Sequence, residues 1–333
     1  MSKSLNFKSA SLLCLASVTL CSTMIRADPV TVNPTRVIDR TTPGLVAALK
    51  PAIKASVSVR NQSLAYSTPA NAGLTAAAAL SSFRIHYDNG DHAIRSINVR
   101  KLPDQTAALN IADSFSDDPI TAFGNWWVIP GATGGELTTS ISSGQEINLT
   151  VPVGPANHRL VLGGFSLRID GSGNNFEKGE VQVGRIAIRL NDPSPQASNS
   201  AASRISGTVF TNDGNRNIIV TVQYVWVPTT YLIGEGRVGN RTDPARTRGG
   251  VGISGQGSPE RLRNSVTAQL PASDRYLIRA FDLKFNNGTH NMLDIGVHLD
   301  GATGSTGADD AISWQDNNRD DPIEWSVNYL NLR

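Results

Sequence analysis

One stretch of the chain recurs, and it limits the possible folds more than any other feature. Residues 83–99, FRIHYDNGDHAIRSINV, return without gaps as residues 281–297, FDLKFNNGTHNMLDIGV. In each copy a strand that alternates apolar with polar residues leads through an Asn-Gly pair, Asn89-Gly90 or Asn287-Gly288, to a second strand. Because Asn-Gly is favoured in type I′ turns, this pattern predicts a β-hairpin. The chain is therefore expected to be built from a repeated β-hairpin module.

The similarity extends to a third, diverged copy in the middle of the chain. Residues 159–167 match residues 275–283 at a constant offset, and Pro130 and Pro228 end two similar closing strands. The predicted fold is all-β, with three tandem, diverged β-sandwich or jelly-roll-like units after a signal peptide. The predicted boundaries are 1–27 for the signal peptide and 28–130, 131–228 and 229–333 for the three units. The pattern leaves open whether the units form beads in a row or pack about a pseudo-threefold axis.

The first 27 residues have the pattern of a secretory signal peptide. Lys3 and Lys8 precede an apolar stretch over residues 10–21, and the small residue Ala27 suits a cleavage site. We therefore expect a secreted, periplasmic or cell-surface protein. Both cysteines of the chain lie in this segment, so the mature chain has none. Its apolar cores, rather than disulfides, must then stabilise it, and bound ions are a further candidate source of stability.

The charge balance argues against nucleic acid as a partner. The formal net charge is +2, but the signal peptide carries three basic residues and no acidic one, so the mature chain is nearly neutral. A nucleic-acid-binding protein normally has an overall basic footprint. The Arg-rich segment 237–263 is the exception, and its glycines favour a solvated loop. No other apolar run is long enough for a transmembrane helix.

An acidic loop in the first and third units is the main candidate for a functional site. It reads DSFSDDPI in the first unit and DNNRDDPI in the third. Clustered carboxylates repel one another unless a cation joins them, and Ca²⁺ prefers such oxygen ligands. The candidate calcium ligands are Asp113, Asp117 and Asp118 in the first unit and Asp316, Asn318, Asp320 and Asp321 in the third. The alternative is a solvated turn in which aspartates cap backbone N–H groups. The second unit offers only Asn212, Asp213 and Asn215, and is expected to lack the site.

His92 and His290 also recur, each two residues after an Asn-Gly pair. Each is expected to face an aromatic residue, Tyr87 or Phe285, and to cover the end of a hairpin as a structural side chain. Zinc is not favoured, because the sequence has neither H-E-x-x-H nor C-x-x-C. The sequence also has no G-x-S-x-G nucleophile motif and no P-loop.

Neighbouring tryptophans in a predicted strand raise a further question. Trp126 and Trp127 must face opposite sides of that strand, so one of them leaves the core side. Packing between units is the favoured interpretation, and an exposed sugar-binding platform is the alternative.

These observations favour an exported, non-enzymatic protein with a binding or assembly role at the cell surface or outside it. A glycan or surface polymer, or further copies of the chain, are the expected partners, and calcium is the expected ion. A carbohydrate-binding or carbohydrate-active secreted protein is one alternative, although paired catalytic carboxylates cannot be read from a sequence. A pore-forming protein is another, because alternating strands also suit amphipathic hairpins.

Overall fold

The computed structural model describes residues 52–55, 63–64, 77–101, 107–113, 118, 120–170, 180–192, 202–239, 265–267, 276–298, 310–317, 321 and 323–332. The predicted signal peptide and most of the Arg-rich segment lie outside these ranges. The strands are β1 (Ala52–Ala55), β2 (Ser63–Leu64), β3 (Ala78–Tyr87), β4 (Ser96–Lys101), β5 (Ala107–Ala112), β6 (Ile120–Val128), β7 (Thr133–Ser142), β8 (Glu146–Thr150), β9 (His158–Asp170), β10 (Val183–Asn191), β11 (Arg204–Thr211), β12 (Asn217–Pro228), β13 (Leu232–Gly239), β14 (Ser265–Thr267), β15 (Tyr276–Phe285), β16 (Asp294–His298), β17 (Asp310–Gln315) and β18 (Ile323–Leu332). The prediction of an all-β chain is confirmed.

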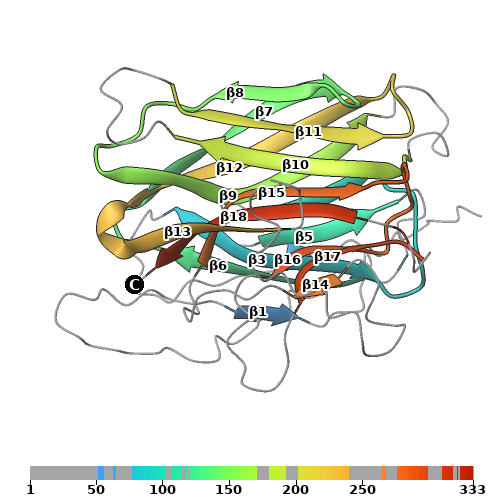
Figure 1. Ribbon diagram of the computed structural model, residues 1–333, viewed down its shortest axis with the longest axis horizontal. Coiled ribbons are helices and arrows are strands. Elements are labelled where there is room, and N and C mark those ends of the chain that lie inside the picture. The colour runs from blue at the N-terminus through green and yellow to red at the C-terminus, as the bar shows by residue number, and fades with distance from the viewer. Residues whose placement is uncertain are drawn as a thin grey trace, which may run out of the picture.

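Three six-stranded antiparallel sheets make up the molecule, and their strands run roughly along its longest axis (Figure 1). Sheet I has the order β1-β6-β3-β16-β17-β14, sheet II has β2-β5-β4-β9-β12-β7, and sheet III has β13-β18-β15-β10-β11-β8. No helix in the described ranges is long and apolar enough to cross a membrane.

Each sheet combines strands from two of the predicted units. The unit boundaries at Pro130 and Pro228 fall between β6 and β7 and between β12 and β13, so each unit contributes six strands. Three of the six lie in one sheet and three in another. The units meet at three seams, which pair β3 with β16, β9 with β4, and β15 with β10. The sheets therefore differ from the expected tandem sandwiches, because their hydrogen bonds cross the predicted boundaries.

The predicted β-hairpins at Asn89-Gly90 and Asn287-Gly288 are wrong. β3 pairs with β6 and β16, whereas β4 pairs with β5 and β9, so the chain passes from one sheet to another at this corner. A type I′ turn needs positive φ at both central residues. Gly90 and Gly288 have φ near +128° and +129°, but among the described non-glycine residues only Asn157 has positive φ. The two strands that flank each Asn-Gly pair lie in different sheets, and both turn their apolar faces towards the same core.

Three phenylalanines, one from each seam, meet in the centre of the molecule. The ring centroids of Phe83 and Phe165 lie 5.3 Å apart, those of Phe165 and Phe281 5.2 Å, and those of Phe83 and Phe281 5.8 Å. Each ring is at most 1% exposed. Such aromatic contacts add about 0.5–1.5 kcal/mol per pair to the free energy gained by burial. The three sheets therefore share one core, to which every unit contributes.

The tryptophan pair does face opposite ways, but neither side chain reaches solvent. Trp126 lies in the central core and donates a hydrogen bond of 2.7 Å from Nε1 to the carbonyl oxygen of Gly163. Trp127 lies in a second apolar cluster with Val161 and Leu277, which come from the other two units. All five tryptophans are at most 7% exposed. The exposed sugar platform is therefore wrong, and packing between units accounts for the pair.

At one end of the molecule three corner segments form a closed ring. Isolated antiparallel bridges join His92 to Met292, His290 to Val183, and Val181 to Ile94. Their backbone hydrogen bonds measure 2.8–3.1 Å. Each unit therefore contacts both others here, and the ring fixes the positions of His92 and His290.

Candidate functional site

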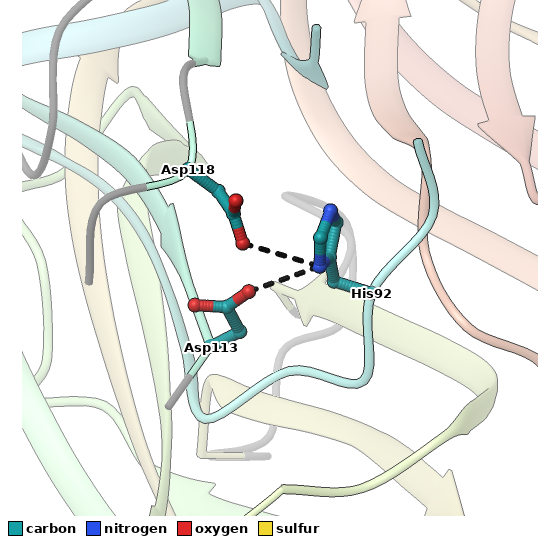
Figure 2. Close-up of side chains that lie close together, drawn as sticks. All are labelled: His92, Asp113 and Asp118. Carbon is teal, nitrogen blue, oxygen red and sulfur yellow. Dashed lines mark ion pairs between the residues drawn. The ribbon is translucent and has the colours of Figure 1, made fainter. Parts of the chain in front are cut away.

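The first cluster of interest joins one histidine to two aspartates. His92 lies in the corner segment between β3 and β4, Asp113 directly follows β5, and Asp118 precedes β6. The Nδ1 atom of His92 lies 3.1 Å from Oδ2 of Asp113 and 3.2 Å from Oδ2 of Asp118. Figure 2 shows both carboxylates directed at this one ring nitrogen. We call these three residues the first cluster.

The second cluster repeats this arrangement in the third unit. His290 lies in the equivalent corner segment, Asp316 follows β17, and Asp321 precedes β18. The Nδ1 atom of His290 lies 2.8 Å from Oδ2 of Asp316 and 3.0 Å from Oδ2 of Asp321. In each cluster the three candidate ligand atoms all lie within 4.8 Å of one another. One metal ion could therefore contact all three.

An asparagine orients both the histidine and one aspartate of each cluster. Asn89 donates from Nδ2 to Oδ1 of Asp118 at 2.5 Å, and its Oδ1 lies 3.1 Å from Nε2 of His92. Because an ionised carboxylate only accepts, the amide nitrogen must face Asp118, and the amide oxygen must accept from Nε2–H. The remaining nitrogen, Nδ1, therefore faces the carboxylates. A cation between the two carboxylates would find the lone pair of this nitrogen directed at it.

The same support recurs in the second cluster. Asn287 donates from Nδ2 to Asp321, and its Oδ1 lies 3.0 Å from Nε2 of His290. This asparagine is the first residue of the Asn-Gly pair that suggested a hairpin. Its role is to hold the side chains of the corner rather than to close a two-residue turn.

An aromatic ring packs against each histidine, as expected from the sequence. The ring centroids of Tyr87 and His92 lie 4.6 Å apart, and those of Phe285 and His290 lie 4.5 Å apart. Burial, followed by the negative charges of Asp113 and Asp118, raises the pKa of the Tyr87 phenol, which therefore stays neutral. These rings shield one face of each imidazole from water.

The two clusters differ in electrostatics. Burial, followed by the hydrogen bond and the charge of Asp321, raises the pKa of Asp316 to about 7, and His290 offsets this only in part. In the first cluster a hydrogen bond with Asp113 is the main cause that lowers the pKa of Asp118, with Asn89 and His92 adding to it.

Four of the seven predicted ligands come together in the structure. Asp113 and Asp118 lie in the first cluster, and Asp316 and Asp321 in the second. The other predicted ligands, Asp117, Asn318 and Asp320, lie outside the described residues.

Sequence reasoning missed the contribution of the histidines, because each histidine lies more than 20 residues before the acidic loop that it joins. The available signal was that His92 and His290 recur at equivalent positions of the repeated stretch, and that each is followed by an acidic loop that recurs as well. Treating the two repeated features together would have pointed to a shared site.

The second unit differs at the same corner. In the ring of bridges Val181 takes the place that His92 and His290 take in the other two units. The side chain of Asn212 accepts a hydrogen bond of 3.0 Å from the backbone N–H of Gln182. Among the described residues only the first and third units hold a His–Asp–Asp group.

One imidazole nitrogen and two carboxylate oxygens form a ligand set that suits Zn²⁺ or Mn²⁺, with water completing the coordination. Ca²⁺ prefers oxygen ligands alone and would have to use the carboxylates. Comparison with protein-family models and with curated proteins finds no match for this chain. The function is therefore argued from the geometry.

Proposed function

We propose that the protein is exported and non-enzymatic, and that it acts in binding or assembly at the cell surface or outside it, with a divalent ion at each of its two His–Asp–Asp clusters. The observation that carries the ion proposal is the duplication of one ligand set. The same histidine, two aspartates and supporting asparagine occur at two equivalent corners, with every Nδ1 to Oδ2 distance between 2.8 and 3.2 Å.

A bound ion would have a defined structural effect. Each cluster ties the corner segment to the end of one strand and the start of another. A cation there removes the repulsion between two aspartates and pins these segments beside the ring of bridges. Zn²⁺ or Mn²⁺ is the first choice because of the imidazole nitrogen, and Ca²⁺, expected from the carboxylates alone, is the second.

The wider proposal rests on the sequence pattern and the strand order together. The gapless match between residues 83–99 and 281–297, and the six strands per unit, support three diverged copies of one unit. The pattern of residues 1–27 supports export. A cysteine-free exported chain without disulfides would gain stability from ions bound at these two corners.

The test is a thermal melt combined with calorimetric titration of residues 28–333, freed of metal with EDTA and then given Zn²⁺, Mn²⁺ or Ca²⁺. We expect two ions per chain and a rise of several degrees in the melting temperature. The double variant Asp118→Asn/Asp321→Asn should lose both effects. Glu146→Gln, which changes an exposed acid on β8, is the matched control. Ion binding that the double variant leaves intact would refute the assignment.

A further inference from the structure

The three seams can be compared position by position, because they share one register. Ile85 pairs with Ile295 in sheet I, Leu283 with Ile186 in sheet III, and Leu167 with Ile97 in sheet II. All six of these side chains are buried. The residues next to them in each strand point to the outer face of the sheet. Differences on the three outer faces therefore occur at equivalent places.

In sheets I and III a buried aspartate neutralises the basic side chains of the seam. Asp294 of sheet I is fully buried and accepts from Nε of Arg84 at 2.8 Å. Asp282 of sheet III is 2% exposed and accepts from Arg185 at 2.8 Å and from Arg189 at 2.6 Å. The cationic side chains of these two seams are thus engaged by carboxylates within the protein.

Sheet II has serine at both of these positions. Ser96 stands where sheet I has Asp294: Ser96 pairs with Arg168, and Asp294 pairs with His86. Ser166 stands where sheet III has Asp282: Ser166 pairs with Asn98, and Asp282 pairs with Ala187. The neutralising acids are therefore absent from this seam, whereas its arginines remain.

Two arginines of sheet II, Arg168 and Arg100, are only weakly engaged. Arg168 is exposed, and no ion pair joins it to a carboxylate of the described chain. Arg100 lies 3.6 Å from the half-exposed Glu136, and its buried Nε has no hydrogen-bond partner within the same ranges. These guanidinium groups are available to an anion from outside.

A groove of about 580 Å³ follows this seam on the outer face of sheet II. Of the described residues that line it, three are arginines, one is an acid, Asp113, and none is aromatic. Hydroxyl and amide groups lie between the charges. The residues that matter here are Arg100, Arg168, Asn98, Ser166 and Thr221.

We propose that this groove binds an acidic saccharide, a sugar chain that carries carboxylate groups. The planar guanidinium fork matches a carboxylate in two parallel hydrogen bonds. Serine, threonine and asparagine side chains suit the hydroxyl groups of a sugar, and the volume is that of a small-ligand site. Single-stranded nucleic acid fits less well, because its binding sites add aromatic rings on which bases stack. The inference rests on the proposed binding role, and the groove meets the first cluster at Asp113.

The test is calorimetric titration of residues 28–333 with trigalacturonate in the presence of EDTA, which separates this groove from any metal site. Maltotriose is the neutral comparison, and inorganic phosphate is the simple anion. We expect trigalacturonate to bind at least tenfold more tightly than either. Equal affinity for maltotriose or for phosphate would overturn the proposal.

Two variants locate the binding. Arg168→Gln removes one guanidinium group. Ser96→Asp introduces the acid that sheet I carries at the equivalent position, Asp294. Because sheet I accommodates an aspartate there, we expect sheet II to tolerate it as well. Each should weaken trigalacturonate binding at least tenfold and leave the melting temperature nearly unchanged. Arg204→Gln, at an exposed arginine on β11, is the matched control. Undiminished binding by both groove variants would contradict the proposal, whatever the result for the metal clusters.

Discussion

The two His–Asp–Asp clusters have the same ligands but not the same surroundings. In the second cluster both aspartates are buried, and Phe285 packs against the histidine. In the first cluster Asp118 is partly exposed, and Tyr87 takes the place of the phenylalanine. Burial raises the pKa of Asp316, the counterpart of Asp113, to about 7, and a hydrogen bond with Asp113 lowers the pKa of Asp118, the counterpart of Asp321. Because both carboxylates of the second cluster are buried, we expect it to depend more strongly on a cation or a proton.

The largest effect should come from breaking one cluster at its histidine. His290→Ala removes the only nitrogen ligand, so we expect Zn²⁺ to bind at one site per chain instead of two, with at least a hundredfold weaker binding at the altered cluster. Calorimetric titration measures this number. His158→Ala, at a histidine far from both clusters in the sequence, should keep two sites. If Ca²⁺ binding survives His290→Ala unchanged while Zn²⁺ is lost, the carboxylates alone hold Ca²⁺.

The next effect concerns the asparagines that orient the ligands. Outer partners of metal ligands are typically worth roughly tenfold to a hundredfold in affinity. Asn287→Ala should weaken metal binding at the second cluster by about this factor, and Asn89→Ala should do the same at the first. The two variants should each change one binding step in a titration. A variant that alters both steps equally would show that the clusters are not independent.

The pH dependence of stability should distinguish the clusters in the metal-free protein. An aspartate whose pKa is raised on folding binds more protons in the folded state, so stability falls as pH rises from about 4 towards 7. Asp316 makes this contribution. The lowered pKa of Asp118 has the opposite sign, and its contribution is lost as pH falls below the usual range of an aspartate.

Melting temperatures of the metal-free chain between pH 4 and pH 8 would measure the contribution of Asp316. This range covers the ordinary pKa of an aspartate, about 4, and the raised pKa of Asp316, about 7. Asp316→Asn should remove a decline on the order of a few degrees, and Asp118→Asn should leave that decline in place. Identical profiles for the two variants would mean that burial does not separate the clusters.

The smallest effect tests the rings beneath the histidines. Tyr87→Phe gives the first cluster the ring of the second. The Tyr87 hydroxyl is buried without a hydrogen-bond partner in the described part of the chain. We therefore expect a gain of about 0.5–1 kcal/mol in the free energy of unfolding, measured by denaturant titration. A loss of stability would indicate that this hydroxyl makes a favourable contact.

The sequence identified strands and buried faces, but it did not identify their partners. Alternation around Phe83 and Phe281 correctly predicted the inward side chains, because that signal depends only on which side of a strand is buried. Asn-Gly suggested a hairpin from local turn chemistry. The packing of three sheets around one core instead selects the partner of each strand. The Asn-Gly residues take no part in that core.

The candidate site was predicted only where its residues are close in the chain. Asp113 and Asp118 form one acidic loop in the sequence, so their proximity could be anticipated. His92 reaches them through the fold, because the corner between β3 and β4 lies beside the ends of β5 and β6. A ligand set divided between an acidic loop and a distant corner leaves no contiguous motif to recognise.

The exchange of strands at the seams has a consequence for how the protein can fold and how it could be rearranged. No unit completes a sheet alone, so a chain shortened at Pro228 would leave two of the three sheets with unpaired seams. Folding must bring distant segments together before any sheet is complete, which predicts slow and cooperative folding. Each unit shares one sheet with each of the other two, so the three units form a closed cycle. The same sheets could therefore form whichever unit came first in the chain. A circular permutant opened at Pro130 should rebuild the same three sheets.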